Sequence, residues 1–167
     1  MRGLSVMALT LGAAALLSAC GKKSEEPVMP QTSPLASAAP ASSSDEITAD
    51  QKAMVAALPA PYNAADPANG LAKFAQCRSC HSIAKGGPTL TGPNLYGVFG
   101  TKAAEIPGFE FSDGMKASGL TWDAPTLDKW IENPRTVVAE TKMTFAGIKD
   151  AKDRQDVIAY LATQRDK

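Results

Sequence analysis

The sequence predicts an all-α fold, in which short helices are joined by loops rich in glycine and proline. Apolar residues recur at helical spacing in three segments, 68–76, 126–133 and 150–164. Between the first two of these segments, residues 83–125 are interrupted by frequent glycine and proline, which favours loops and short helical turns over a sheet. No internal repeat is visible.

Length and charge restrict the classes of protein that fit. The chain has 167 residues and equal numbers of basic and acidic side chains, 17 of each. It is long enough for one domain with a buried core, and we expect a monomer. A neutral chain lacks the basic surface of a nucleic-acid-binding protein, so nucleic acid is not an expected partner.

The N-terminus has the layout of a signal peptide, predicted over residues 1–19. Its apolar run, residues 4–17, would cover only about 21 Å as a helix, which is short for a bilayer. Residues 17–20 read Leu-Ser-Ala-Cys and resemble the lipobox of bacterial lipoproteins, so Cys20 is predicted to carry lipid and to hold the chain on a membrane. The alternative is an ordinary cleavage site with an incidental cysteine.

A tether is predicted over residues 20–65, ahead of a folded domain over residues 66–167. The early part of the tether is rich in alanine, serine and proline and has too few large apolar side chains to fold. A short helix is possible at 49–58, because Thr48 and Gln51 have the spacing of a capping box. The sequence leaves open whether this helix packs on the domain.

The pentapeptide Cys-Arg-Ser-Cys-His at residues 77–81 carries the chemistry. Two thiols one helical turn apart can each add to a vinyl group of haem, while the adjacent His81 reaches the iron. The alternatives for Cys77 and Cys80 are a disulfide, a thioredoxin-like redox pair and half of a zinc site. Zinc prefers four nitrogen or sulfur ligands, and the exported chain has no further Cys or His to supply them.

The second axial position of such an iron needs another ligand, because His81 is the only histidine. Outside the leader and the tether, two methionines remain. Met143 lies in a loop ahead of the last predicted helix and can approach the iron. Met115 is flanked by polar turn residues and is the less favoured candidate.

The chain from Gly70 to Leu161 resembles class I cytochrome c, the group that includes mitochondrial cytochrome c and bacterial proteins of the same subclass. The matching pieces, in order, are CRSCH at 77–81, GPNL at 92–95, GVFG at 97–100, PGF at 107–109, GLTW at 119–122, ENP at 132–134, TKMTFAGI at 141–148 and DVIAYL at 156–161. The resemblance implies about four to five helices wrapped around one covalent haem c.

The resemblance also implies a role for individual residues. His81 and Met143 would be the axial ligands of the iron, and the carbonyl of Pro93 would orient the imidazole. Trp122 would donate a hydrogen bond to a haem propionate, and Phe145 would belong to the haem-binding residues. Gly70 and Phe74 would pack against Tyr160 and Leu161 where the first and last helices cross, in the same core.

Four positions depart from the family pattern. Thr101 stands where the family often has arginine, and Phe111 stands at a tyrosine position on the propionate side. Met115 replaces a buried asparagine, and Trp130 replaces a tyrosine beneath the methionine ligand. Since polar partners of the haem and its ligand are lost, the reduction potential of relatives does not transfer to this chain.

The function implied is single-electron transfer, without enzymatic activity, by a cytochrome anchored on the periplasmic side of a bacterial membrane. Its redox partners would be a quinol-oxidising complex as donor and a terminal oxidase as acceptor. The main alternative is a haem-based peroxidase or gas or redox sensor with a labile methionine ligand. A further alternative is a non-haem interaction module with a Cys77–Cys80 disulfide. Five basic residues are expected either to surround the haem edge or to be ordinary surface residues: Lys73, Arg78, Lys85, Lys142 and Lys149.

Overall fold

The computed structural model describes residues 47–166. The predicted signal peptide at 1–19, the lipidation site Cys20 and the predicted tether up to residue 46 lie outside the described residues. Over the described range, every helix is too short or too polar to cross a bilayer.

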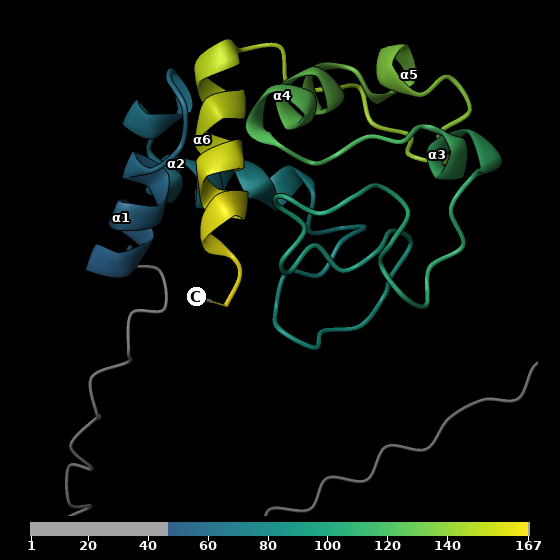
Figure 1. Ribbon diagram of the computed structural model, residues 1–167, viewed down its shortest axis with the longest axis horizontal. Coiled ribbons are helices and arrows are strands. Elements are labelled where there is room, and N and C mark those ends of the chain that lie inside the picture. The colour runs from purple at the N-terminus through teal and green to yellow at the C-terminus, as the bar shows by residue number, and fades with distance from the viewer. Residues whose placement is uncertain (1–46, 167) are drawn as a thin grey trace, which may run out of the picture. The chain divides into compact units, whose positions relative to one another are not determined.

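The described residues form helices joined by loops, which confirms the all-α prediction (Figure 1). Their only β-type pairing is an isolated bridge between Lys102 and Thr121. In chain order the helical elements are α1 (Ala49–Ala56), the 3-10 helix η1 (Tyr62–Ala64), α2 (Pro67–Lys73), the 3-10 helix η2 (Phe74–Gln76), α3 (Asp113–Ala117), α4 (Ala124–Glu132), α5 (Pro134–Val137) and α6 (Ala151–Thr163).

Most of the α-helices begin where a short polar side chain caps the first turn. Each of these side chains accepts a hydrogen bond from a backbone N–H that has no partner within the helix. In α1 the cap is the complete capping box that the sequence predicts, with Thr48 and Gln51 bonding reciprocally. The capping residues are Thr48, Asp66, Ser112, Asp123 and Asp150.

Helices α2 and α6 cross at very short distance because Gly70 lies at the contact. A Cβ atom on Gly70 would overlap the Asp156 backbone carbonyl and lie 2.9 Å from Cβ of Tyr160. Phe74 is fully buried, and its ring centroid lies 5.3 Å from that of Tyr160. The crossing implied by the family resemblance is therefore present, and it fixes the segment that leads into Cys77.

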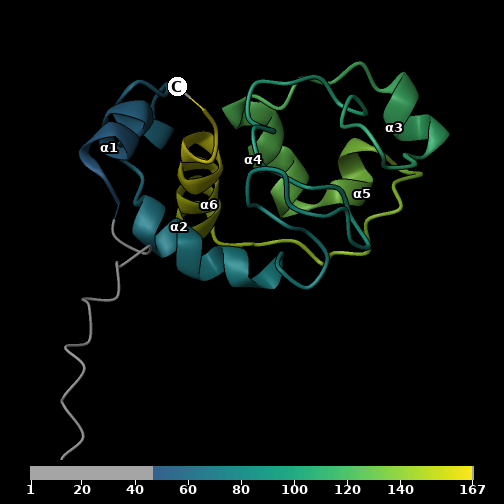
Figure 2. The ribbon, with the colours of Figure 1, turned by 90° about the horizontal axis from the view of Figure 1, so that it is seen from below.

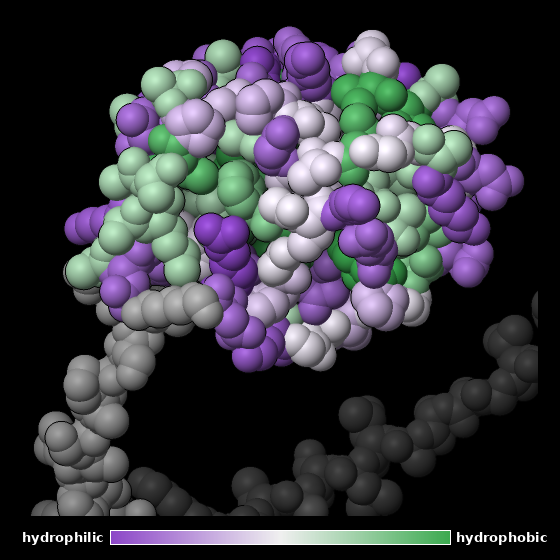
Figure 3. Space-filling model, viewed as in Figure 1, coloured by the Kyte–Doolittle hydropathy of each residue, from purple (hydrophilic) through white to green (hydrophobic). Residues whose placement is uncertain are grey.

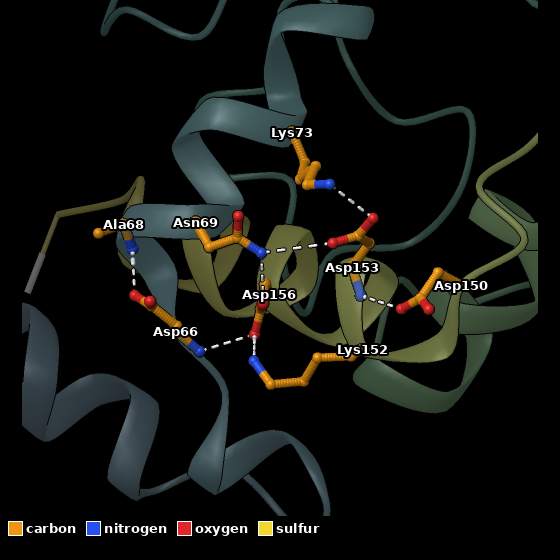
Figure 4. Close-up of polar contacts among 8 residues, drawn as sticks. All are labelled: Asp66, Ala68, Asn69, Lys73, Asp150, Lys152, Asp153 and Asp156. Carbon is orange, nitrogen blue, oxygen red and sulfur yellow. Dashed lines mark hydrogen bonds and ion pairs between the residues drawn. The ribbon is translucent and has the colours of Figure 1, made fainter.

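A buried carboxylate ties the start of α2 to α6 at this crossing (Figure 4). Asp156 is 0% exposed and accepts hydrogen bonds from the backbone N–H of Asp66 and from Asn69 Nδ2, both at 2.7 Å. Lys152 contributes an ion pair to the same carboxylate. Because a buried charge is costly unless it is paired and hydrogen-bonded, these partners are what allow an aspartate in this core.

The segment ahead of Asp66 is folded, contrary to the prediction that the tether runs to residue 65. Val55, Leu58 and Tyr62 are buried in the same core cluster as α6. The sequence leaves packing of this short helix open, and the structure shows it packed. The boundary at residue 66 is too late because α1 offers few apolar side chains, and their burial depends on a surface of α6 that the local sequence does not reveal.

Candidate haem site

A cavity of about 250 Å³ opens among α3, α4, α6 and the long loops, and its lining is mostly apolar. The segments around it include η2 and the loop that carries the CxxCH motif, with the loop 141–145 on the same cavity. All of the predicted site residues within the described range line this one cavity: Cys77, Cys80, His81, Pro93, Trp122, Met143 and Phe145. The remaining predicted site residue, Cys20, lies outside the described residues.

The imidazole of His81 is held by backbone groups. Its Nδ1 lies 2.7 Å from the carbonyl oxygen of Pro93. Because a carbonyl oxygen only accepts, Nδ1 carries the hydrogen and Nε2 keeps its lone pair for another partner. Gly92 leaves room for the ring, since a Cβ atom there would lie 2.7 Å from His81 Nδ1.

Burial lowers the pKa of His81, and the hydrogen bond to Pro93 opposes this effect only in part. The imidazole is therefore neutral at physiological pH, which is the form that binds a metal. A neutral ring with its Nε2 lone pair uncommitted fits an axial ligand of haem iron.

The two thiols are presented by a single helical turn. Cys77 N–H donates to the Phe74 carbonyl at 2.8 Å, and the N–H groups of Cys80 and His81 both donate to the Cys77 carbonyl, at 3.1 and 2.9 Å. This turn directs all three side chains of the motif into the same cavity. Burial raises the pKa of the Cys77 thiol to about 11, which disfavours the thiolate that a thioredoxin-like pair requires.

The zinc alternative finds no support in the described residues. No group of three or more His, Cys, Asp or Glu side chains is assembled anywhere between residues 47 and 166. Cys77 and Cys80 are both free thiols, so the structure does not form the disulfide of the alternative non-haem interaction module.

Both candidate methionines line the cavity, in different surroundings. Met143 lies in an extended loop, where its N–H donates to Thr141 Oγ1 at 3.1 Å. Met115 lies in α3 and is only 5% exposed, and its sulfur is 4.0 Å from the hydroxyl of Ser118. A loop can adjust its sulfur to a ligand more easily than a short packed helix, which favours Met143.

Two tryptophans form one wall of the cavity. The ring centroids of Trp122 and Trp130 lie 5.2 Å apart with a tilted arrangement. Trp122 is predicted as a site residue, whereas its pairing with Trp130 is missed because the two residues belong to a loop and a helix whose approach depends on the fold. Of the four departures from the family pattern, Phe111, Met115 and Trp130 line the cavity.

Charged side chains are sparse around the cavity, where Lys142 is the only charged lining residue. Lys142 Nζ donates to the Glu110 carbonyl at 2.6 Å. Two of the other basic residues that could surround the haem edge are paired, Lys73 with Asp153 at 2.8 Å and Lys85 with Asp166 at 2.7 Å. Figure 3 shows hydrophilic side chains spread around the outline of one face, with apolar ones between them.

A neutral imidazole, two thiols on one turn and an apolar cavity define a c-type haem protein. The Cytochrome c family profile matches residues 65–165, and the chain belongs to this family. It is 54% identical over 106 residues to cytochrome c2 of Rhodomicrobium vannielii, covering 62% of this chain and 82% of that protein. It is 37% identical over 105 residues to cytochrome c of Kluyveromyces lactis, covering 62% and 96%.

A solved structure shows the same fold. Cytochrome cH from Methylobacterium extorquens superposes with a TM-score of 0.54 at 47% sequence identity, covering 57% of this chain and 96% of that one. The chain is therefore an electron-transfer cytochrome with the class I fold, and it binds one covalent haem c for which Cys77 and Cys80 provide the CxxCH motif. Membership in this family argues against an enzyme.

Proposed function

We propose that this cytochrome is lipid-anchored on the periplasmic side of a bacterial membrane and carries single electrons between respiratory complexes. The observation that carries the electron-transfer part of the proposal is that His81 and Met143 line one apolar cavity, with the Nε2 lone pair of His81 uncommitted. With both residues as ligands, the iron would have no open coordination position for a substrate, which suits electron transfer better than catalysis.

The residues of the chain hold and shield the haem, which supplies one-electron redox chemistry when bound. Cys77 and Cys80 would hold it through thioether bonds, and His81 and Met143 would bind the iron. The Pro93 carbonyl accepts a hydrogen bond from Nδ1–H of His81 and would hold the imidazole in a fixed orientation toward the iron. The apolar lining excludes water, which limits rearrangement when the charge on the iron changes.

The anchor in this proposal is Cys20, followed by a tether over residues 21–46. The lipobox-like sequence ahead of Cys20 and the serine- and proline-rich composition that follows it support this arrangement. The donor we propose is a quinol-oxidising complex and the acceptor a terminal oxidase, both of which meet a periplasmic carrier at the membrane surface.

The experiment is membrane fractionation of the full chain, expressed in a bacterium that attaches haem c. Wild type is expected in the membrane fraction, and Cys20→Ser is expected in the soluble periplasmic fraction with an unchanged absorption spectrum. Mass spectrometry of the N-terminal peptide identifies the acyl chains directly. A wild-type protein that is soluble, or a Cys20→Ser variant that stays on the membrane, contradicts the anchor.

The redox assignment is tested with the same preparations. Isolated membranes that contain a quinol-oxidising complex are expected to reduce the haem, and membranes with a terminal oxidase are expected to reoxidise it. Peroxide turnover or tight carbon monoxide binding by the wild-type protein would instead favour the peroxidase or sensor alternative, since both need an open iron.

A further inference from the structure

Residues 47–64 form an element that precedes the part of the chain matched by the cytochrome c family. It consists of α1, a short connection and η1. Its apolar side chains are well buried, with Val55 at 4%, Leu58 at 8% and Tyr62 at 6% exposure. We call residues 47–64 the N-terminal extension.

A polar contact adds specificity to this apolar packing. Tyr62 Oη donates to Asp128 Oδ2 of α4 at 3.3 Å. The other oxygen of Asp128 accepts from Nε of Arg154 in α6, and Arg154 is only 7% exposed. One carboxylate therefore links the extension to two helices of the cytochrome domain, and its charge is compensated by the guanidinium.

The extension lies on the opposite side of α6 from the haem cavity. Figures 1 and 2 both place α6 between α1 and the group formed by α3, α4 and α5. Val157 and Leu161 of α6 line the cavity, whereas none of residues 47–64 does. One face of α6 thus serves the cavity while another receives the extension.

We propose that the N-terminal extension docks the N-terminal side of the chain against the face of α6 that points away from the haem cavity. A membrane tether would then start on that side of the domain. The docking itself follows from the contacts above. Its consequence for the tether rests on the proposed function, in which Cys20 carries the anchor.

Docking shortens the proposed tether. If the extension were undocked, the flexible stretch would run over residues 21–64, with a typical end-to-end distance of about 36 Å. With the extension docked, residues 21–46 remain, and the distance falls to about 28 Å. A partner complex moves freely in the membrane plane, so the concentration of the domain near the membrane varies inversely with the reach of the tether, and docking raises it by about 1.3-fold.

Hydrogen exchange of the full-length holoprotein tests the docking. Val55→Asp places a charge in the buried contact, and Ala53→Asp adds the same charge on the exposed side of α1 as a matched control. In wild type and Ala53→Asp the amides of residues 52–57 should be protected. Val55→Asp should lower their protection at least tenfold while the amides of α6 and the haem spectrum stay unchanged.

Tyr62→Phe serves as a second variant that keeps the ring and removes the bond to Asp128, and a smaller, few-fold loss of protection in residues 52–64 is expected. Exchange of residues 52–57 at the rate of a free peptide in wild type would overturn the proposal. So would protection that is equal in wild type and Val55→Asp.

The consequence for the tether is tested in vesicles of phosphatidylethanolamine and phosphatidylglycerol that also hold a purified quinol-oxidising complex. Val55→Asp is expected to be reduced about 1.3-fold more slowly than Ala53→Asp on the vesicles, and equally fast by a small soluble reductant. Equal rates on the vesicles would overturn the effect on the tether. If wild type fails to bind vesicles, the anchoring proposal fails, and the exchange experiment still decides the docking.

Discussion

At the scale of single residues, the imidazole of His81 is positioned by the backbone of its neighbours in the 92–93 loop. The Pro93 carbonyl fixes the tautomer, and Gly92 provides the space that the ring occupies. No side chain could replace this arrangement without moving the loop, because the contact is made by main-chain atoms. The cost of a change here should therefore appear in haem ligation as well as in stability.

Gly92→Ala tests this contact. The new methyl group would overlap the His81 ring, so we expect the variant to lose about 1–3 kcal/mol of stability and to hold its haem in an altered ligation state. Thermal unfolding and the absorption spectrum of the holoprotein measure the two effects.

The matched control is Gly97→Ala, at a position with φ of 73° and no atoms within 4 Å of the added methyl group. It should cost about 1–2 kcal/mol through backbone strain alone and leave the spectrum unchanged. A Gly92→Ala protein whose spectrum matches that of wild type would show that the ring can move without consequence.

The haem-attachment residues could be predicted from sequence because their signal is local. The pentapeptide at 77–81 is a contiguous motif that contains both thiols and the imidazole, so it can be recognised without knowledge of the fold. The pairing of Trp122 with Trp130 and the burial of Asp156 could not be predicted in the same way. Each depends on partners from another element, and an aspartate in an amphipathic helix ordinarily faces solvent.

At the scale of elements, the crossing of α2 and α6 carries the motif. Gly70 allows the backbones to meet, and Asp156 bonds the first turn of α2 from within α6. Since η2 and Cys77 follow α2 directly, a shift at the crossing is transmitted to the thiols. The crossing therefore belongs to the haem site, and two of its residues, Phe74 and Leu161, also line the cavity.

Gly70→Ala should disrupt this crossing. The added methyl group would overlap the Asp156 carbonyl, and backbone on both sides cannot rotate away, so we expect a loss of about 3 kcal/mol in the free energy of unfolding. Denaturant titration of the holoprotein measures it.

Gly114→Ala in α3 is the matched helix control. There the nearest atom is Glu140 Cβ at 3.2 Å, a contact that a shift of a few tenths of an ångström in the Glu140 segment relieves, so the change should stay within about 1 kcal/mol. A Gly70→Ala variant that is as stable as this control would contradict the close crossing.

The ion pair between Lys73 of α2 and Asp153 of α6 makes a pH-dependent contribution. The hydrogen bond from Lys73 lowers the pKa of Asp153 below its ordinary value of 3.8, and the same bond raises the pKa of Lys73 above 10.5. A lowered carboxyl pKa stabilises the fold above pH 3.8, and this contribution disappears as pH falls through the lower value. The lysine contribution is complete below pH 10.5 and disappears at higher pH.

Asp153→Asn is therefore expected to unfold at lower temperature than wild type at neutral pH, by a small amount because the pair is partly solvent-exposed. The two melting temperatures should converge once pH falls below the lowered pKa of Asp153. Thermal scans from neutral to acidic pH provide the measurement, and a difference that persists unchanged in acid would assign the effect to something other than this charge.

Helical periodicity located three helices of the domain, with small differences at their ends. The predicted segment 68–76 is α2 followed by the tighter turn η2, and 150–164 contains α6. The short helix α3 was not predicted, because its five residues lie in a region rich in glycine. Such a helix is stabilised by its cap and by burial of Met115 more than by its own sequence pattern.

At the scale of the whole molecule, positive and negative charges balance. The chain carries no net charge, and Lys73 and Lys85 are neutralised by partners. A lysine that is paired within its own protein contributes little to long-range attraction of another. A domain that is held near its partners by a membrane anchor has less need of such attraction.

We therefore expect electron transfer from a quinol-oxidising complex to depend weakly on salt. The rate should change by less than about twofold between about 20 mM and 200 mM salt, a range over which unpaired surface charges become strongly screened. Stopped-flow reduction of the haem at several salt concentrations measures it. A rate of reduction that falls steeply as the salt concentration rises would show that the basic residues attract the partner electrostatically.

The position of the domain boundary also belongs to this scale. Composition marks the beginning of the predicted tether, but the end of it depends on whether α6 offers a complementary surface. Tyr62 is separated from its partner Asp128 by 66 residues of chain, and Val55 is buried in a cluster that includes α6 near the other end of the domain, so no local pattern predicts their burial. The N-terminal extension could be recognised only once the fold was known.

The central claim is that the haem iron is bound by His81 and Met143 in a closed electron carrier. Its most direct test is the weak near-infrared absorption band of sulfur-ligated ferric haem, recorded for the holoprotein and for two variants. We predict that the band is present in wild type, survives Met115→Ala and disappears in Met143→Ala. Its absence from wild type, or its loss only in Met115→Ala, would contradict the account.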